Sequence, residues 1–506
     1  MKYVLAVERG ERITLSELMR LDLNSRFTLA VLQSGQKPER YLMSAQVQSS
    51  DRGALPVAAL RNPWKEICAA SIGNALEFYD LLIYGYFAVV IGKLFFPTAD
   101  ETTSLLLSVG TFGISFVMRP LGAIILGSYT DRAGRKASLT MSIAIMMAGT
   151  AIIVFAPTYS QIGIISPLII IVARMLQGFS TGGEFGAATA FMVEHADAKR
   201  RGFFASWQSS TQGLATVLAA GVSALISYTL TESQVNDWGW RVAFGVGLLV
   251  GPVGLYIRSQ IDETPEFTKL PAVKQGNSPL SRVLVRDRMN LLLGIGVVAG
   301  VTAFNYVHKV YMPTYALTQL HIPATSSFVG ALVTGVVLMV TAPMFGTLSD
   351  RYGRLRVLST AVLMACLTSY PLFLMLTLWP TVTTLLAVQA LVGLLIAACL
   401  GPIPAMLSEI FPTNTRGTGL ALTYNFSVTF FGGFAPLIVT WMIAATANKM
   451  APSFYVIATS IISITALLAL GRRLGAVDKF SRSGTPSADR LDSAARSDGS
   501  HSEVMS

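Results

Sequence analysis

The chain alternates between long apolar runs and short polar segments from residue 63 to residue 471. A helix needs about 20 apolar residues to cross a bilayer, and it satisfies its backbone hydrogen bonds internally, as the membrane interior requires. The pattern therefore predicts an all-α polytopic membrane protein with twelve transmembrane helices. We expect the spans at residues 66–92, 103–126, 137–156, 164–192, 203–229, 241–258, 290–314, 327–349, 357–378, 383–408, 418–444 and 452–471.

The composition supports a membrane protein. Of the 506 residues, 52% are hydrophobic and 13% are charged, whereas a soluble protein carries about 25% charged residues. The three cysteines, Cys68, Cys366 and Cys399, lie inside apolar runs, where a small buried side chain is their usual role. We expect no disulfide, no metal site and no cofactor.

A charged loop motif occurs twice. The pattern G-x-x-x-D-R-x-G-R stands at 127–135 and returns at 346–354, and a glutamate followed seven residues later by Arg-Gly is also doubled. Two patterns that repeat in register indicate an internal duplication, so we expect two related six-helix bundles. We interpret these residues as a cytoplasmic gate, with topology marking by positive charge as the alternative: Gly127, Asp131, Arg132, Gly134, Arg135, Glu194, Arg201, Gly346, Asp350, Arg351, Gly353, Arg354, Glu409 and Arg416.

Basic residues gather in alternate loops, at 127–136, near 199, within 259–289 and near 351. Cytoplasmic loops carry an excess of Lys and Arg, so this asymmetry predicts that both termini are cytoplasmic. It also accounts for the net charge of +10 without a nucleic-acid partner. We expect a multi-pass protein of the cytoplasmic (inner) membrane, a monomer in the lipid bilayer.

The predicted spans divide the chain into five parts. These are a cytoplasmic N-terminal segment (1–62), a first six-helix bundle (63–258), a cytoplasmic connecting loop (259–289), a second six-helix bundle (290–471) and a disordered cytoplasmic tail (472–506). Met43 stands ahead of the first span, and we interpret it as an alternative start. We therefore expect residues 1–42 to be dispensable.

The first span carries two carboxyl groups. Asn74, Glu77, Asp80 and Tyr84 fall on one stripe of the helix at about 100° per residue. An ionisable group inside a span is a functional hypothesis by default, and low dielectric and a like charge both favour the protonated form of a carboxyl. We interpret Glu77 and Asp80 as candidate proton carriers. The alternative is that both are held in structural ion pairs with other helices.

Further polar residues interrupt other spans. His308 is a candidate proton relay because an imidazole titrates near neutral pH. Basic side chains can bind a carboxylate, with compensation of the buried acids as the alternative, which we favour for Arg119. The candidate substrate-binding residues are Asn74, Arg119, Arg174, Gln177, Gln208, Gln212, Asn305 and Lys309. Gly178, Gly182 and Gly186 have the small-x-x-x-small spacing that lets another helix approach closely.

The doubled loop motif resembles the signature of the major facilitator superfamily, and Arg174-x-x-Gln177-Gly178 is similar to its fourth-helix motif. Other motifs resemble its metabolite–proton symporters, which include citrate, 2-oxoglutarate, shikimate and proline/betaine symporters. These motifs are Gly73-Asn74-x-x-Glu77-Phe-x-Asp80, Arg119-Pro120-Leu-Gly122, Gln177-Gly-Phe-Ser-x-Gly182-Gly183-Glu184, Trp238-Gly-Trp-Arg241 and Glu263-Thr-Pro-Glu266. The pair His308-Lys309 departs from the family pattern, which has uncharged residues there.

The resemblance covers residues 63–471 and implies a secondary active transporter, not an enzyme. We expect it to import a small organic acid of the di- or tricarboxylate type with protons by alternating access. The sequence has no G-x-x-x-x-G-K-[ST] loop for ATP. A proton-coupled proline/betaine symporter is the alternative, and Lys309 favours the anion. A non-transporting metabolite sensor and a drug exporter are less favoured.

Overall fold

The computed structural model describes residues 63–133, 135–182, 199–259, 279–412 and 415–483, and these residues fold into helices with no strand among them. The segment before residue 63, which includes Met43, lies outside the described residues. The described part forms one unit by its contacts, so its two halves can be compared directly.

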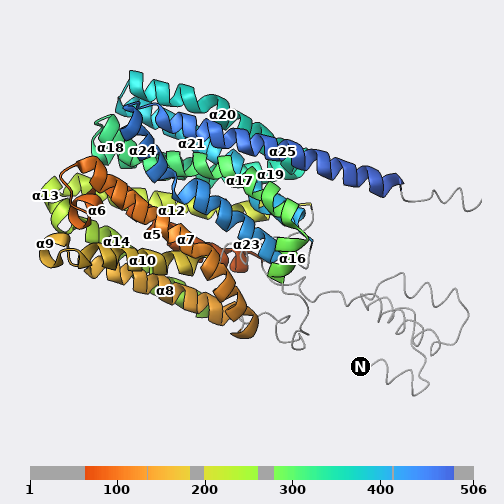
Figure 1. Cartoon of the computed structure of the whole chain (residues 1–506), viewed down its shortest axis with the longest axis horizontal. Coiled ribbons are helices and arrows are strands. Elements are labelled where there is room, and N and C mark those ends of the chain that lie inside the picture. Colours follow the sequence, from red (N-terminus) through yellow and green to blue (C-terminus); the bar gives the residue numbers. More distant parts are fainter. Residues whose placement is uncertain (1–62, 134, 183–198, 260–278, 413–414, 484–506) are drawn as a thin grey trace, which may run out of the picture. The chain divides into compact units, whose positions relative to one another are not determined.

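The first half of the described chain supplies six helical segments, some of them broken (Figure 1). The elements are α5 (Pro63–Tyr86), α6 (Ala88–Phe95), α7 (Glu101–Ala133), α8 (Arg135–Phe155), α9 (Tyr159–Ile162), α10 (Ile165–Thr181), α12 (Arg201–Thr229), α13 (Glu232–Gln234), η2 (Val235–Gly239) and α14 (Trp240–Ser259). Helix α8 packs against both α10 and α14, as Figure 1 shows.

The second half repeats this plan. Its elements form another six membrane segments, and the short helix α16 precedes them. The elements are α16 (Pro279–Val285), α17 (Arg288–Asn305), η3 (Tyr306–Tyr311), α18 (Met312–Gln319), α19 (Ala324–Tyr352), α20 (Arg354–Leu378), α21 (Val382–Leu400), α22 (Ile403–Ile410), α23 (Arg416–Ser427), η4 (Val428–Gly433), α24 (Ala435–Thr446) and α25 (Ala451–Ser483). The described segments thus occupy all twelve predicted spans.

The helices have the length and composition that a membrane requires. Eight described segments are long and apolar enough to cross a bilayer, and the bent pair Glu77–Tyr86 and Ala88–Phe95 makes a ninth. Thr140–Phe155 and Ile165–Thr181 are shorter apolar helices in the third and fourth predicted spans. The prediction of an all-α membrane fold is confirmed.

The observed helices differ from the predicted spans at several places, and α7 continues seven residues past its predicted end at 126, to Ala133. The first span bends by 66° between α5 and α6. The segment 259–289 contains the helix α16, while residues 260–278 are not described. The last helix continues to Ser483, twelve residues past the predicted end at 471. The predicted end at 471 was placed where the residues change from apolar to polar. Such a change marks where a helix leaves the membrane and does not end the helix itself. No proline follows until Pro486, so nothing breaks the helix before Ser483.

Close helix packing in the first half depends on small residues. A Cβ added to Gly178 or Gly182 would lie 1.7 Å from Ser115 O or 1.9 Å from Arg119 O. These glycines therefore let α10 contact the backbone of α7, as their spacing predicted.

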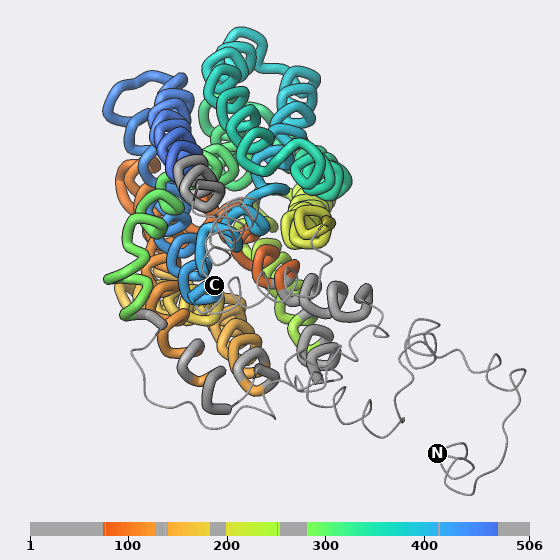
Figure 2. Tube along the Cα trace, turned by 90° about the vertical axis from the view of Figure 1, so that its right-hand side faces the viewer, coloured from red at the N-terminus to blue at the C-terminus, as the bar shows by residue number. Residues whose placement is uncertain are grey.

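The two halves contact each other chiefly through α12 and α19, which lie side by side in Figure 2. A Cβ on Gly346 would lie 2.5 Å from Gly202 O, so this crossing also requires glycine. We call the end of the bundle where α12 begins and α19 ends the motif end, because it carries the second copy of the loop motif. At the opposite end, Tyr86 and Phe87 of the first half pack on Phe328 of α19, with ring centroids 5.6 and 6.0 Å apart. The halves are therefore in contact at both ends.

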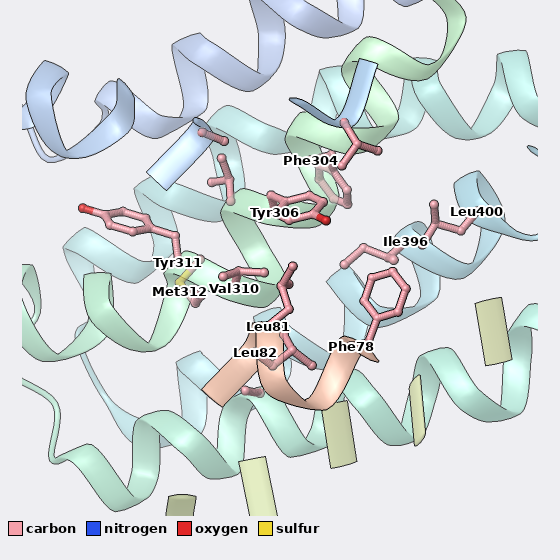
Figure 3. Packing of buried hydrophobic residues seen from close by; sticks show 14 of the residues in the cluster. Phe78, Leu81, Leu82, Phe304, Tyr306, Val310, Tyr311, Met312, Ile396 and Leu400 are labelled. Carbon is pink, nitrogen blue, oxygen red and sulfur yellow. The ribbon is translucent and has the colours of Figure 1, made fainter. Parts of the chain in front are cut away.

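Three segments widen into π-helix: η2, η3 and η4. Segments η3 and η4 lie in the seventh and eleventh spans and contact α5 and α7 of the first half. Figure 3 shows Phe78, Leu81 and Leu82 of α5 next to Val310 of η3 and Ile396 of α21. Single π-turns inside helices often mark functional sites, and η3 and η4 lie at the boundary between the halves.

Candidate functional site

Helix α5 positions the polar stripe of the first span. Asn74, Glu77 and Asp80 are all buried, with exposed fractions of 5%, 8% and 5%. The Asn74 Nδ2 donates to Gln208 O at 3.1 Å and to Thr211 Oγ1 at 2.8 Å, both on α12. The stripe predicted from the sequence is thus buried inside the bundle, and its first member is fixed to the helix that contacts the second half.

Asp80 begins a hydrogen-bonded chain that crosses four helices. Its Oδ2 accepts from the hydroxyl of Thr150 on α8. Thr150 Oγ1 also accepts from Gln177 Nε2 at 2.9 Å, and Gln177 Oε1 accepts from Arg174 Nη1 at 2.7 Å. Arg174 Nη2 reaches Ser115 Oγ on α7 at 3.2 Å. We call Asp80, Thr150, Gln177, Arg174 and Ser115 the carboxyl–arginine chain.

The hydroxyl of Thr150 allows this chain two proton arrangements. Its oxygen lies within bonding distance of Asp80 Oδ2 and also 3.1 Å from Met146 O. A hydroxyl has one hydrogen to donate and two lone pairs. When Asp80 is ionised, Thr150 donates to the carboxylate. When Asp80 is protonated, the acid donates to Thr150, which turns its hydrogen to Met146 O.

The other oxygen of Asp80 is left without a partner among the described residues. Asp80 Oδ1 is buried and accepts no hydrogen bond, and no salt bridge to Asp80 is found in the described part of the chain. An unpartnered buried oxygen costs less on a neutral acid than on a carboxylate. Among the described residues, Asp80 is therefore held by the hydrogen bond from Thr150 and not by an ion pair.

Space beside Asp80 comes from a glycine on α14. A Cβ on Gly247 would lie 2.2 Å from Asp80 Oδ1. Glu77 and Asp80 both line two cavities in the first half. One of these cavities is also lined by Arg119 and Arg174, so the two carboxyl groups and the two guanidinium groups share one buried space.

The two buried arginines pack on aromatic rings. The Arg174 Cζ lies 4.3 Å from the ring centre of Tyr84, the last residue of the predicted stripe. Arg119 Cζ lies 4.1 Å above Phe116, and that ring packs edge-on against Tyr306 of η3. The structure therefore places Arg119 beside the boundary with the second half, and Arg174 within the first half.

The second half contributes three buried polar residues from the end of α17 and from η3. Asn305, His308 and Lys309 are 3%, 0% and 0% exposed. His308 Nδ1 lies 3.1 Å from Phe304 O, and its ring packs on Phe304 and Phe373, all within the second half. Lys309 Nζ lies 3.4 Å from Gln212 Oε1 of α12. The structure thus separates His308 from Lys309, although the two are neighbours in sequence.

At the motif end, Asp350 joins the two halves. Its Oδ1 accepts from the backbone N–H of Gly202 at 2.8 Å, and its Oδ2 accepts from that of Phe203 at 2.9 Å. Helix α12 begins at Arg201, so a carboxylate of the second half satisfies the N-terminus of a first-half helix. This contact at the start of α12 crosses between the two halves, and Asp350 is one of the residues that we interpreted as a gate.

Arg354 contacts two carboxylates of the second half. It lies 3.4 Å from Asp350 Oδ1 and pairs with Glu409 of α22. Gly353, which precedes it, has φ +92°, and this backbone form lets α20 start directly after α19. Arg351 is exposed, and the Arg354–Glu409 pair lies wholly within the second half.

Some predicted site residues cannot be placed. The surroundings of Gly127 and the side chains of Asp131, Arg132 and Arg135 are not described, and Gly134, Glu184, Gly186 and Glu194 lie outside the described residues. Conversely, sequence reasoning missed Ser115, Thr150 and Gly247. Their only signal is a small or polar residue within an apolar run, and such residues are common in transmembrane helices.

Comparison with known proteins gives two family matches. Residues 66–277 match the family described as sugar (and other) transporter, and residues 324–494 match the Major Facilitator Superfamily. Each half of the chain therefore matches a transporter family separately.

Curated relatives align with most of the chain. The citrate-proton symporter of Klebsiella pneumoniae is 34% identical over 410 residues, which cover 80% of this chain and 91% of that protein. The proline/betaine transporter of Escherichia coli (strain K12) is 32% identical over 411 residues, covering 79% and 82%. Among solved structures, a D-xylose-proton symporter superposes with a TM-score of 0.64 at 18% identity, covering 81% of this chain and 97% of that one.

Proposed function

Because the chain belongs to the metabolite–proton symporters of the major facilitator superfamily, we propose that it imports a small organic acid together with protons. The observation that carries this proposal is the buried space in which Glu77 and Asp80 face Arg119 and Arg174. Ionisable groups inside a membrane span are costly, and the spans that contain them line ion or substrate pathways.

The proton is carried by the carboxyl groups of α5. The Thr150 hydroxyl accommodates both protonation states of Asp80 with its hydrogen bonds intact, and Glu77 lines the same cavities. A carboxyl that is neutral in one conformation and ionised in the other couples proton movement to the conformational change. His308 is a less direct candidate, because its ring lies among Phe304 and Phe373 of the second half.

Alternating access proceeds by rocking of the two halves about the contacts between them. The motif end is the cytoplasmic end in this proposal, with both termini on that side, and the protein functions as a monomer in the inner membrane. The bonds from Asp350 to the start of α12 hold this end closed. The first copy of the motif, at Asp131, has the corresponding role.

The substrate binds at the boundary between the halves, where Lys309 reaches Gln212 and where Arg119 packs on Phe116 beside Tyr306. We favour an organic acid because three basic side chains are buried in the described core. In addition, the alignment with the citrate-proton symporter covers 91% of that protein. A proton-coupled osmolyte symporter is the second candidate, supported by the proline/betaine relatives.

Transport by purified protein in liposomes tests the proposal. An imposed inward pH gradient should drive accumulation of a di- or tricarboxylate, and a parallel assay with proline and glycine betaine tests the second candidate. Glu77→Gln and Asp80→Asn keep the side-chain shape and remove the titration. If either residue carries the driving proton, its variant should lose gradient-driven uptake and keep exchange of labelled for unlabelled substrate, which moves no net proton.

Glu101→Gln is the matched control, because Glu101 is an exposed carboxylate whose ion pair within the described residues is with Lys93, at 3.5 Å. It should transport as the unmodified protein does. If both Glu77→Gln and Asp80→Asn accumulate substrate with unchanged pH dependence, the coupling site lies elsewhere. If no carboxylate or zwitterion is taken up under a pH gradient, the proposed function is refuted.

A further inference from the structure

The described core holds one more basic group than acidic groups. Its buried carboxyl groups are Glu77 and Asp80, and its buried cationic side chains are Arg119, Arg174 and Lys309. The two carboxyl groups share a cavity with the two arginines. Lys309 is the basic group without an acid in that cavity, and protonation of either carboxyl would only increase the positive surplus.

The ammonium of Lys309 is poorly satisfied by its surroundings. It is 0% exposed, and the nearest acceptor, Gln212 Oε1, lies at 3.4 Å, long for a charged hydrogen bond. Its Nζ lies 5.3 Å from the ring centre of Phe78. Among the residues that the structure describes, no carboxylate lies within salt-bridge distance of it. A buried ammonium without a carboxylate partner is costly in free energy, and binding of an anion would lower that cost.

The widened turn η3 directs Lys309 toward the first half. His308 packs on Phe373, and its carbonyl accepts from Gln389, both in the second half. Lys309, the next residue, instead reaches Gln212 of α12 and Phe78 of α5. The ammonium therefore lies at the boundary between the halves, where the substrate is proposed to bind.

We infer that Lys309 is the specificity-determining residue for anionic substrates, and that the Gln212 amide oxygen occupies the place of a substrate carboxylate when no substrate is bound. The inference deepens the proposed function and rests on it for the location of the substrate. A carboxylate oxygen carries negative charge and therefore attracts an ammonium more strongly than a neutral amide oxygen does. A carboxylate thus displaces Gln212 and neutralises the surplus charge.

A zwitterion gains less from this site. A betaine brings its own positive charge along with its carboxylate, so its entry leaves the net charge of the core unchanged. A di- or tricarboxylate lowers that charge. Lys309 therefore discriminates between substrates by their net charge.

Three variants test the inference. Lys309→Met keeps the length of the side chain and removes its charge, Lys309→Arg keeps the charge, and Gln212→Glu supplies an internal carboxylate that pairs with Lys309. Binding of citrate, succinate and glycine betaine is measured without a gradient, as ligand-induced thermal shifts of purified protein in detergent. Elution as a single species on size exclusion confirms that each variant is folded.

Lys309→Met and Gln212→Glu should each weaken binding of the carboxylates by about 10- to 100-fold relative to glycine betaine. Lys309→Arg should retain the preference for anions. The inference is overturned if Lys309→Met leaves the ratio of carboxylate to betaine affinity unchanged, or if the unmodified protein prefers betaine. Because these assays need no proton gradient, they can support the anion site even where gradient-driven uptake fails and refutes the proposed function.

Discussion

Replacement of Asp350 by asparagine gives the sharpest test of the contact between the halves. The side chain is 8% exposed and accepts two backbone N–H groups at the start of α12, at 2.8 and 2.9 Å. An asparagine has one oxygen, and its NH₂ group would face the other N–H. The variant therefore loses one charged hydrogen bond and the interaction of a negative charge with the helix N-terminus.

The size of the effect follows from these two losses. A hydrogen bond to a charged group contributes about 1.5–3 kcal/mol, and a charge at a helix N-terminus contributes about 0.3–1 kcal/mol. Together they favour opening of the motif end by roughly 2–4 kcal/mol, a shift of roughly 30- to 800-fold in the equilibrium between closed and open forms. Transport should fall, because the motif end no longer closes reliably.

The assay is alkylation of a reporter cysteine from the motif end. Ser206→Cys, in a background without Cys68, Cys366 and Cys399, places a thiol at a position with 0% exposure next to Gly346. Asp350→Asn should increase its alkylation rate. Glu409→Gln is the matched control, since it removes a carboxylate at the same end whose partner, Arg354, lies in the same half. Equal alkylation rates in Asp350→Asn and the parent would refute the gating role.

Two further substitutions have outcomes that the geometry determines. Gly247→Ala should abolish proton-driven uptake while the protein still inserts, because the new Cβ would lie 2.2 Å from Asp80 Oδ1; wild-type uptake in proteoliposomes would contradict this. Arg241→Ala should lower the melting temperature in detergent and leave exchange intact. It removes hydrogen bonds to Val154 O at 3.1 Å and Ala156 O at 2.9 Å at the end of α8, worth about 1–2 kcal/mol at this partly exposed site; an unchanged melting temperature would show that these bonds contribute nothing.

Much of the fold could be predicted because membrane helices are defined by local composition. Runs of apolar residues located all twelve helical segments, and the doubled motif indicated two related halves. The glycine spacing predicted the close contact of α10 with α7. The bend of 66° after Tyr86 and the π-turn η3 were not predicted, because both depend on how neighbouring helices pack rather than on the local apolar pattern.

The site could be predicted less completely than the fold. The stripe of Asn74, Glu77 and Asp80 was correct as a helix face, yet its members contact different helices: Asn74 bonds to α12 and Asp80 to α8. The partner Thr150 is a lone polar residue in an apolar run, and nothing in the sequence relates it to Asp80. Which side chains meet is decided by the rotation of each helix against its neighbours, and that information is not local.

Helix α12 connects the proposed binding and gating contacts physically. Asp350 holds its first residues, Gly202 and Phe203, and Gln212 holds Lys309 ten residues further along. At 1.5 Å per residue the two contacts are about 15 Å apart on one continuous helix. A substrate that binds Lys309 in place of Gln212 breaks one of the hydrogen bonds between α12 and the second half. The hydrogen bonds to Asp350 then contribute a larger share of the free energy that holds the halves together. Packed helices move as rigid elements, and a change at the substrate site therefore reaches the motif end through α12 itself.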